Sequence, residues 1–253
     1  MKKVFLKTLC LFLSFIALAY FAGPIQAHAA YVLPDGATRR GIDVSRWNGP
    51  INWSLVKQSN IDFAIIRTSF ADSSLSNCVD KHMRENIQGA KAVGIPIGAY
   101  HYSYATSIET ALKEADLFIH CLSGTQWEYP VYFDFEDKCQ LKLTVAQRTD
   151  IACAFLERVR SAGYCVGMYA NLNWINTKLD MSRLQNYELW VAQWNSHCTC
   201  THAYSMWQYT DKGSLNGIYC NYISRMTPRS VVDMNLCYVD YPTYMRENHL
   251  NGF

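Results

Sequence analysis

Two carboxylates stand on alternate positions of an aromatic and aliphatic run, PVYFDFED, at residues 130–137. They are Asp134 and Glu136. If this run is a β-strand, both acids point to the same face, because successive side chains alternate between the two faces of a strand. Crowded carboxylates raise one another's proton affinity. Such a pair can hold one protonated and one ionised carboxyl at the same pH, which the cleavage of a glycosidic bond requires.

Two further acids stand in short apolar runs of the same kind, Asp43 in GIDVS and Asp233 in VVDMN. Each is flanked by aliphatic residues, which would face the opposite side of a strand. A single acid at a strand end is more often a cap or a salt-bridge partner than a catalyst. Four acids in runs of this kind, with Arg67 of IIRTS as the cation found among them, favour a shared site, because buried carboxylates without cationic partners are costly.

The elements that must position these acids follow from the hydrophobic pattern. Short runs rich in β-branched or aromatic residues predict eight strands, at residues 41–45, 63–69, 96–103, 130–136, 165–170, 189–194, 204–210 and 231–238. Five segments of helical period separate the first six of them, at residues 52–59, 79–93, 107–122, 145–162 and 172–179. Alternation of this kind predicts a parallel sheet with helices outside it. Eight strands of parallel type predict a single-domain α/β fold, a closed TIM-like barrel whose last helices are missing or reduced, with its chemistry at the carboxyl ends of the strands.

The first 29 residues have the form of a secretory signal peptide. Lysines come first, an apolar stretch covers residues 4–22, and a small-x-small site ends at Ala29. An uncleaved membrane anchor is the alternative, because the apolar stretch approaches the length of a spanning helix. We therefore expect a signal peptide at residues 1–29, a connector at 30–39 and a catalytic barrel at 40–253. We expect a bacterial protein that is secreted or associated with the cell wall and that meets a membrane only if the first segment is kept.

The charge balance limits the partners. Without the three lysines of the signal segment, 20 Lys and Arg residues face 21 Asp and Glu residues. This balance gives no support to nucleic acid or an anionic membrane surface as a partner, and we expect a monomer. Nine cysteines remain in the mature chain, an odd number whose pairing cannot be read from the sequence.

A run of histidines and cysteines, HCTCTH, occupies residues 197–202. Its cysteines are closer together than the cysteine ligands of zinc sites, so we interpret it as a loop and predict neither a metal nor a cofactor. None of the cysteines sits in a motif that would make it a nucleophile. His101 lies beside the predicted site, where it would bond either the substrate or a neighbouring acid.

Seven motifs taken together resemble the family 25 glycoside hydrolases. In chain order they are GIDVSRWNGPINW, GAYHYS, VYFDFE, GMYAN, LWVAQW, MWQYTD and VDMN. Members of this family are the Chalaropsis-type lysozymes, N-acetylmuramidases that cut bacterial peptidoglycan, and they have a (β/α)5β3 barrel. The resemblance runs from about Arg40 to Tyr238. The chain departs from the family in its high cysteine content and at Arg67, where a lysine would be expected.

The resemblance implies a role for each acid. Glu136 is then the general acid that protonates the leaving oxygen, Asp134 is its partner, and Asp43 and Asp233 complete the pocket. An i, i+2 pair on a strand has Cα atoms about 6.5–7 Å apart. That spacing lies between the carboxyl separations expected for direct nucleophilic attack and for inversion through water. Asp134 can therefore attack, activate water, or orient the substrate's own 2-acetamido oxygen, and we favour the last of these.

Aromatic and amide side chains at other strand ends are expected to bind the sugars, although any one aromatic could equally be a core residue. The candidates are Tyr100, Tyr102, Tyr169, Trp194 and Gln208. The predicted function is hydrolysis of the β-1,4 bond between N-acetylmuramic acid and N-acetylglucosamine, with peptidoglycan glycan strands as the partner. A non-catalytic wall-binding module on the same fold is the alternative, and the presence of all four acids weighs against it.

Overall fold

The computed structural model describes residues 31–33, 38–71, 78–219 and 231–253. The predicted signal segment, together with residues 30 and 34–37 of the predicted connector, lies outside the described residues. In the described part of the chain, no helix is both long enough and apolar enough to cross a bilayer.

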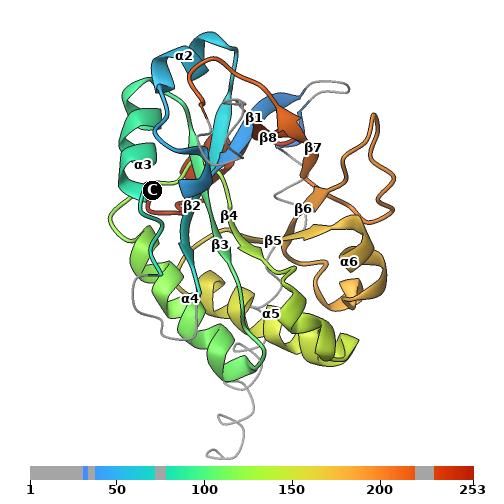
Figure 1. Cartoon of the computed structure of the whole chain (residues 1–253). Coiled ribbons are helices and arrows are strands. Elements are labelled where there is room, and N and C mark those ends of the chain that lie inside the picture. The colour runs from blue at the N-terminus through green and yellow to red at the C-terminus, as the bar shows by residue number, and fades with distance from the viewer. Residues whose placement is uncertain (1–30, 34–37, 72–77, 220–230) are drawn as a thin grey trace, which may run out of the picture.

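The strands close into one barrel in which they follow one another in chain order (Figure 1). They are β1 (Arg39–Val44), β2 (Phe63–Phe70), β3 (Ile97–Tyr102), β4 (Val131–Asp134), β5 (Val166–Asn171), β6 (Glu188–Ala192), β7 (Met206–Gly213) and β8 (Val232–Cys237). Neighbours from β1 to β7 are parallel. The prediction of a closed, TIM-like α/β barrel is confirmed.

The direction of the last strand corrects the prediction. β8 runs antiparallel to both β7 and β1, so the barrel is not built of eight parallel strands. Parallel neighbours need a long crossover connection, usually a helix, whereas antiparallel neighbours do not. The reversed strand therefore explains why no helix is needed between β7 and β8, whereas the parallel pair β6 and β7 is joined by a connection without a helix.

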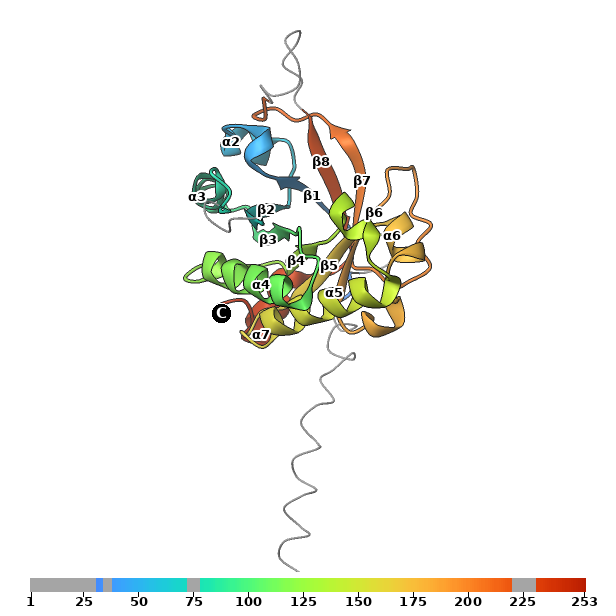
Figure 2. The same ribbon diagram turned by 60° about the horizontal axis from the view of Figure 1, so that its bottom comes forward.

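All five predicted helices are present and lie outside the barrel, where α4 and α5 run side by side (Figure 1, Figure 2). They are α2 (Trp53–Gln58), α3 (Met83–Ala92), α4 (Ile108–Leu122), α5 (Val145–Arg160) and α6 (Leu172–Thr177). Ser107 and Thr144 cap the backbones of α4 and α5, each in a capping box with the residue three positions along the chain. A further helix, α7 (Tyr241–Glu247), was not predicted.

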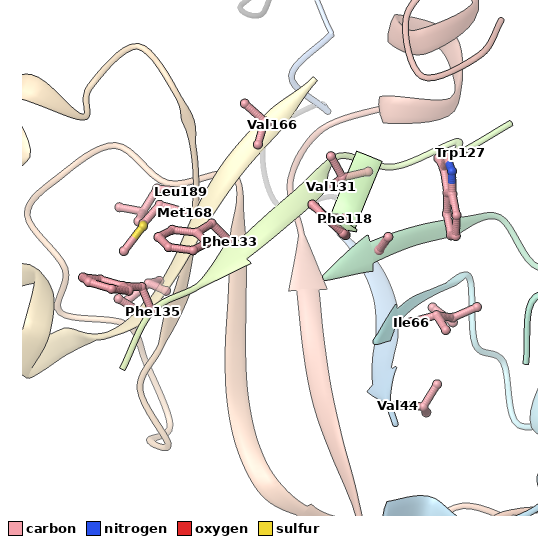
Figure 3. Close-up of a cluster of buried hydrophobic side chains, with 14 of the residues drawn as sticks. Val44, Ile66, Phe118, Trp127, Val131, Phe133, Phe135, Val166, Met168 and Leu189 are labelled. Carbon is pink, nitrogen blue, oxygen red and sulfur yellow. The ribbon is translucent and has the colours of Figure 1, made fainter. Parts of the chain in front are cut away.

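The core has two layers, separated by the alternation of side chains along each strand. Outward side chains such as Ile66, Phe133 and Met168 pack between the strands and the helices (Figure 3). The ring of Phe133 stacks on that of Phe155 from α5, with ring centroids 3.9 Å apart. Inward side chains, among them Phe63, fill the barrel itself. The strand that carries Asp134 is thus held from both faces.

The two ends of the barrel differ. We call the end at which β1–β7 terminate the mouth, and the opposite end the base. At the base, Val32 forms an antiparallel bridge with Val239, and the backbone N–H of Asp240 donates to the carbonyl of Tyr31 at 2.9 Å. The hydroxyl of Tyr31 also donates to Glu247 of α7 at 2.5 Å. Residues 31–33 are thereby fixed to the base.

Candidate active site

Three of the four predicted acids lie on strands at the mouth. Asp43 is the penultimate residue of β1, and Asp134 is the last residue of β4. Asp233 is the second residue of β8. Because β8 is antiparallel, its first residues lie where the other strands end, and Asp233 is the direct cross-strand partner of Asp43. The reversal of β8 therefore brings Asp233 to the other acids.

Glu136 lies two residues beyond the end of β4, because the strand is shorter than predicted. Phe135 is fully buried, and its backbone N–H still donates to the carbonyl of Tyr169 at 3.4 Å. The next residue, Asp137, caps a short 3-10 helix at Lys138–Lys142 and thereby ends the extended run. The carboxyl of Glu136 lies at the mouth, where it meets the side chain of Asn171 at the end of β5.

One hydrogen bond orients the carboxyl of Glu136. The Nδ2 group of Asn171, at the end of β5, donates to Glu136 Oε2 at 3.3 Å. The Oδ1 atom of the same Asn171 accepts the N–H of Trp174 and caps α6. The capping bond fixes the amide, so its Nδ2 group is held toward the acid.

The carboxyl of Asp43 is held by two amides. Gln208 Nε2 and Asn235 Nδ2 each donate to Asp43 Oδ2 at 2.9 Å. The indole N–H of Trp190 donates to Asn235 Oδ1 at 2.8 Å and fixes that amide in turn. Asp43 is therefore a rigid, hydrogen-bonded acid at the centre of the mouth.

The predicted sugar ligand Gln208 has several protein partners. Its Oε1 atom accepts the hydroxyl of Tyr169 and the indole N–H of Trp194, both at 3.1 Å, while its Nε2 group serves Asp43. With only 3% of its surface exposed, Gln208 is placed to position Asp43. Contact of its amide with a sugar stays a prediction.

The predicted aromatic ligands lie at different depths. Trp194 is 60% exposed, so its ring face is open to a sugar. Tyr102 is partly buried and donates its hydroxyl to Asp137 Oδ2 at 3.2 Å. Tyr100 and Tyr169 lie in the barrel interior against Trp190, so their ring faces are already covered by protein. Among the predicted rings, Trp194 offers the most open surface for stacking.

Asp134 is buried and incompletely bonded. It is 5% exposed, and its Oδ1 atom has no hydrogen-bond partner among the described residues. A buried acceptor without a partner is costly, which makes this oxygen a place where a bound ligand can donate a hydrogen bond. Among the described residues, Asp43 and Asp233 have no buried side-chain oxygen that lacks a hydrogen-bond partner.

All four acids have raised pKa values. Burial, followed by the negative charges of Glu136 and Asp43, raises the pKa of Asp134 well above its ordinary range. Burial also raises the pKa of Glu136 and that of Asp43. For Asp233, burial and then the neighbouring charge of Asp43 raise the pKa to about 9. The mouth therefore retains protons at a pH where exposed carboxyls have lost them.

His101 does not face the mouth. Its Nδ1 atom lies 2.8 Å from Ser69 Oγ, and its Nε2 atom lies 3.1 Å from Glu114 Oε2 of α4. The ring is fully buried against Phe118 and Phe155, outside the barrel wall. Of the two predicted partners, His101 thus bonds a neighbouring acid.

The described residues contain no group of three or more His, Cys, Asp or Glu side chains arranged to hold a metal ion. Within the HCTCTH run, Cys198 and Cys200 carry free thiols and are partly exposed. The run lies between β6 and β7, in a connection without helix or strand.

Sequence reasoning missed the two asparagines that bond the acids, Asn171 and Asn235. Both stand at the ends of motifs that it quoted, GMYAN and VDMN. The available signal was spacing: Asn235 follows Asp233 by two residues, so both share the inward face of β8. An amide is an uncharged partner for a carboxylate, so it gives no charge pattern to search for.

We expect the substitution Asp233→Asn to flatten the pH dependence of stability. The pKa of about 9 lies above the ordinary 3.8, so the folded protein binds a proton that the unfolded chain releases, and the free energy of unfolding falls as pH rises between these values. Removing one such proton changes the slope by at most about 1.4 kcal/mol per pH unit. The slope is obtained from the free energy of unfolding measured by urea denaturation at pH 5, 7 and 9.

The exposed Asp116, which pairs with Arg158 on the surface, provides the matched control. Asp116→Asn is expected to retain the wild-type slope. An unchanged slope in Asp233→Asn would show that Asp233 is ionised at neutral pH.

Comparison with known proteins identifies the family and agrees with the fold. The sequence model described as "Glycosyl hydrolases family 25" matches residues 42–218. The autolytic lysozyme of Clostridium acetobutylicum is 27% identical over 184 residues, which cover 71% of this chain and 52% of that protein. The bacterial lysozyme of Streptomyces coelicolor has a TM-score of 0.63 and 26% identity, over 79% of this chain and 92% of that one.

A second solved structure is the modular autolysin LytC from Streptococcus pneumoniae in complex with a synthetic peptidoglycan ligand. It has a TM-score of 0.67 and 26% identity, over 79% of this chain and 47% of that one. The family match covers well over half of the 253 residues. This chain therefore belongs to glycosyl hydrolases family 25 and is a glycoside hydrolase.

Proposed function

We propose that this chain is a lysozyme that hydrolyses peptidoglycan at the β-1,4 bond between N-acetylmuramic acid and N-acetylglucosamine. The observation that carries the proposal is the pair formed by Glu136 and Asp134 at the mouth of a family 25 barrel. Both carboxyls have raised pKa values, and Asp134 has a buried oxygen without a partner among the described residues. The lysozyme names of the relatives support peptidoglycan as the substrate.

In the proposed reaction Glu136 gives its proton to the glycosidic oxygen as the bond to the anomeric carbon breaks. The acetamido oxygen of the same sugar forms a bond to that carbon. Asp134 accepts a hydrogen bond from the acetamido N–H at its Oδ1 atom, which favours the ionised form of Asp134 as positive charge develops on the ring. Water then attacks the anomeric carbon as the bond from that carbon to the acetamido oxygen breaks, which restores the acetamide, and Glu136 takes back a proton from the water.

Asp43 and Asp233 complete the proposed site as a pair that shares a proton. Burial raises the pKa of Asp43, whereas hydrogen bonds from Asn235 and Gln208 oppose the rise. The negative charge of Asp43 also raises the pKa of Glu136, which keeps the general acid protonated. Stacking on a sugar is assigned to the exposed ring of Trp194. Tyr102 is assigned a contact at the edge of the site, while the buried Tyr100, Tyr169 and Gln208 are assigned to its floor, where they support the acids.

The proposal extends to the layout of the chain. Residues 1–29 are a secretory signal peptide, residues 30–39 a connector and residues 40–253 the catalytic barrel, so the enzyme acts outside the cell as a monomer. Mass spectrometry of the mature N-terminus tests the first of these. A chain that begins at Ala30 is expected, and one that retains Met1 would establish the anchored form.

The product of digestion tests the activity. With purified peptidoglycan, we expect muropeptides whose reducing ends are N-acetylmuramic acid, identified by mass spectrometry after borohydride reduction. Reducing N-acetylglucosamine would indicate a glucosaminidase. Binding without cleavage would establish the alternative wall-binding module.

The stereochemistry of the same reaction tests the route. Attack by the acetamido oxygen followed by attack of water gives retention, so proton NMR should detect the β-anomer as the first product. Net inversion would exclude the assisted route and favour a water molecule activated by Asp134.

Two substitutions next to Glu136 should shift the pH profile in opposite directions. The charge of Asp137 raises the pKa of Glu136, and the hydrogen bond from Asn171 lowers it. The acid works while protonated, so activity is present below its pKa and is lost as pH rises through it. We expect Asp137→Asn to move the alkaline limb of kcat/KM to lower pH and Asn171→Asp to move it to higher pH.

Both substitutions keep the side-chain oxygen that caps the following helix, so we expect both variants to keep the fold. A shift of the pH profile then reports on Glu136 and not on a loss of structure. Profiles measured between pH 4 and 9 on solubilised glycan strands decide the outcome. Limbs that stay in place, or that move in the same direction, would show that Glu136 is not the titrating acid.

A further inference from the structure

A pair of arginines lies on the β1–β2 side of the mouth. Arg46 begins the 3-10 helix Arg46–Asn48 directly after β1, and Arg67 lies on β2. The guanidinium carbon of Arg46 lies 4.3 Å from the ring centroid of Phe70, the last residue of β2, and 4.8 Å from that of Trp47. The guanidinium carbon of Arg67 lies 5.4 Å from the same Phe70 ring. Aromatic rings thus hold the Arg46 cation in place at a partly exposed position.

One carboxylate serves both arginines. Asp80 Oδ2 accepts the Nε–H of Arg67 at 2.8 Å and the backbone N–H of Arg46 at 2.9 Å. No ion pair joins the guanidinium of Arg46 to a carboxylate among the described residues. The described cluster of Arg46, Arg67 and Asp80 therefore carries one positive charge in excess.

The cluster also contains an unused donor. Arg67 is 6% exposed, and its Nη2 group has no hydrogen-bond partner in the described part of the chain. A guanidinium has five N–H donors and no acceptor, so only an acceptor can satisfy this group. A buried donor of a charged group that is left unpaired is costly, which indicates a site that a ligand completes.

The cluster adjoins the reacting acids. Arg67 is the cross-strand partner of Tyr100 on β3, and Tyr102, two residues further along β3, is the partner of Asp134 on β4. The charge of Arg67 accordingly opposes the rise that burial causes in the pKa of Asp134 and in that of Tyr100. The charges of Arg67 and Arg46 also oppose the rise that burial causes in the pKa of Tyr104. Tyr104 lies beyond the end of β3 and is 44% exposed. A sugar placed at Asp134 and Glu136 therefore has this cationic cluster at its side.

We propose that Arg46 and Arg67 form a carboxylate-binding site for the anionic substituent of the muramic acid residue. Hydroxyl and acetamido groups are neutral, so an excess cation adds little to their binding, whereas a guanidinium binds a carboxylate through two parallel charge-assisted hydrogen bonds. The carboxylate comes either from a free lactyl group or from the stem peptide attached to it. The site would then select muramic acid over N-acetylglucosamine next to the cleaved bond. This inference rests on the proposed function.

Three forms of glycan strand separate the two sources of the carboxylate. The first form is peptide-free and carries free lactyl carboxylates, the second is the same strand with those groups converted to methylamides, and the third retains the stem peptides. The measured quantity is the kcat/KM of each carboxylate-bearing strand divided by that of the methylamide strand. We expect Arg46→Gln to lower this ratio about 10–100-fold, because a hydrogen bond to a charged group is lost.

The pattern of the loss identifies the source. A fall confined to the peptide-free strand assigns the site to the lactyl carboxylate, and a fall confined to the third form assigns it to the stem peptide. Arg46→Lys keeps the positive charge but loses the two parallel N–H donors of the guanidinium, so it should lower the ratio less. Arg84→Gln, at an exposed arginine of α3, should leave it unchanged.

An unchanged ratio in Arg46→Gln would overturn the carboxylate site while leaving the proposed function intact. Wild-type protein that cleaves none of the three strands would instead overturn the proposed function. Arg46 is chosen over Arg67 because Arg67 forms the buried ion pair with Asp80, and its substitution would leave the carboxylate of Asp80 as a buried charge without its cation.

Discussion

Glu136→Gln is expected to lower kcat for the hydrolysis of glycan strands by about 10²–10⁴-fold, the usual contribution of general acid catalysis. Glutamine keeps the size of the side chain and can still accept the hydrogen bond from Asn171. It has no proton of suitable acidity for the leaving oxygen. KM should therefore change little, because the lost interaction belongs to the transition state. Reducing ends released from solubilised peptidoglycan measure kcat.

A change of leaving group separates loss of the acid from loss of the fold. An aryl glycoside of the same sugar needs little protonation to leave, so Glu136→Gln should retain far more of the wild-type rate on it. Glu109→Gln, at an exposed ion pair with Lys113 on α4, should match wild type on both substrates. Equal loss on both substrates would mean that Glu136 is not the proton donor.

Asp134→Asn is expected to lower kcat by about 10²–10³-fold, the size of effect seen when a preorganised electrostatic partner is removed from an active site. The neutral amide cannot stabilise the positive charge that develops as the acetamido oxygen attacks. Since burial raises the pKa of Asp134, the substitution should leave the thermal unfolding temperature unchanged or higher. Stability measured beside activity thus distinguishes a chemical defect from a folding defect.

The acetamido group of the substrate completes the test. On strands whose 2-amino groups have been deacetylated, wild type should slow greatly, and Asp134→Asn should cause little further loss, because the two groups act as a unit. If Asp134 were the nucleophile, its substitution would still lower the rate on the deacetylated strand by its full factor. Additive losses would therefore contradict the assisted route.

The strands and helices were predictable where one face is buried. In β4 the alternation of Val131, Phe133 and Phe135 with Tyr132 and Asp134 separates the outer layer from the barrel interior, as the pattern indicates. The caps of α4 and α5 were equally readable, because a capping box needs two residue types at a fixed spacing. Local rules of this kind act within a few residues.

The direction of β8 was not predictable from that pattern. The alternation of side chains has the same form whichever way a strand runs, so parallel and antiparallel strands show the same pattern in the sequence. Asp233 reaches the mouth only because it stands at the start of a reversed strand. Asp233 was predicted to lie near Asp43, and it does, although the parallel direction predicted for its strand was wrong.

The end of β4 and the last helix show two further limits. Asp137 caps the next 3-10 helix, which ends the strand before Glu136, and competition between a cap and a strand is decided by local hydrogen bonds. The helix α7 had a readable start, Asp240 as N-cap followed by a proline in its first turn. Its seven residues are fewer than the window over which a helical period can be recognised in a sequence.

The attachment of residues 31–33 fixes the place at which the preceding part of the chain joins the barrel. Those residues are pinned beside Val239 and Asp240, at the pole of the barrel opposite the four acids. Any segment upstream of Tyr31 therefore joins the molecule behind its working end. Held by an uncleaved segment, the enzyme would present its acids outward, toward the wall and away from the lipid.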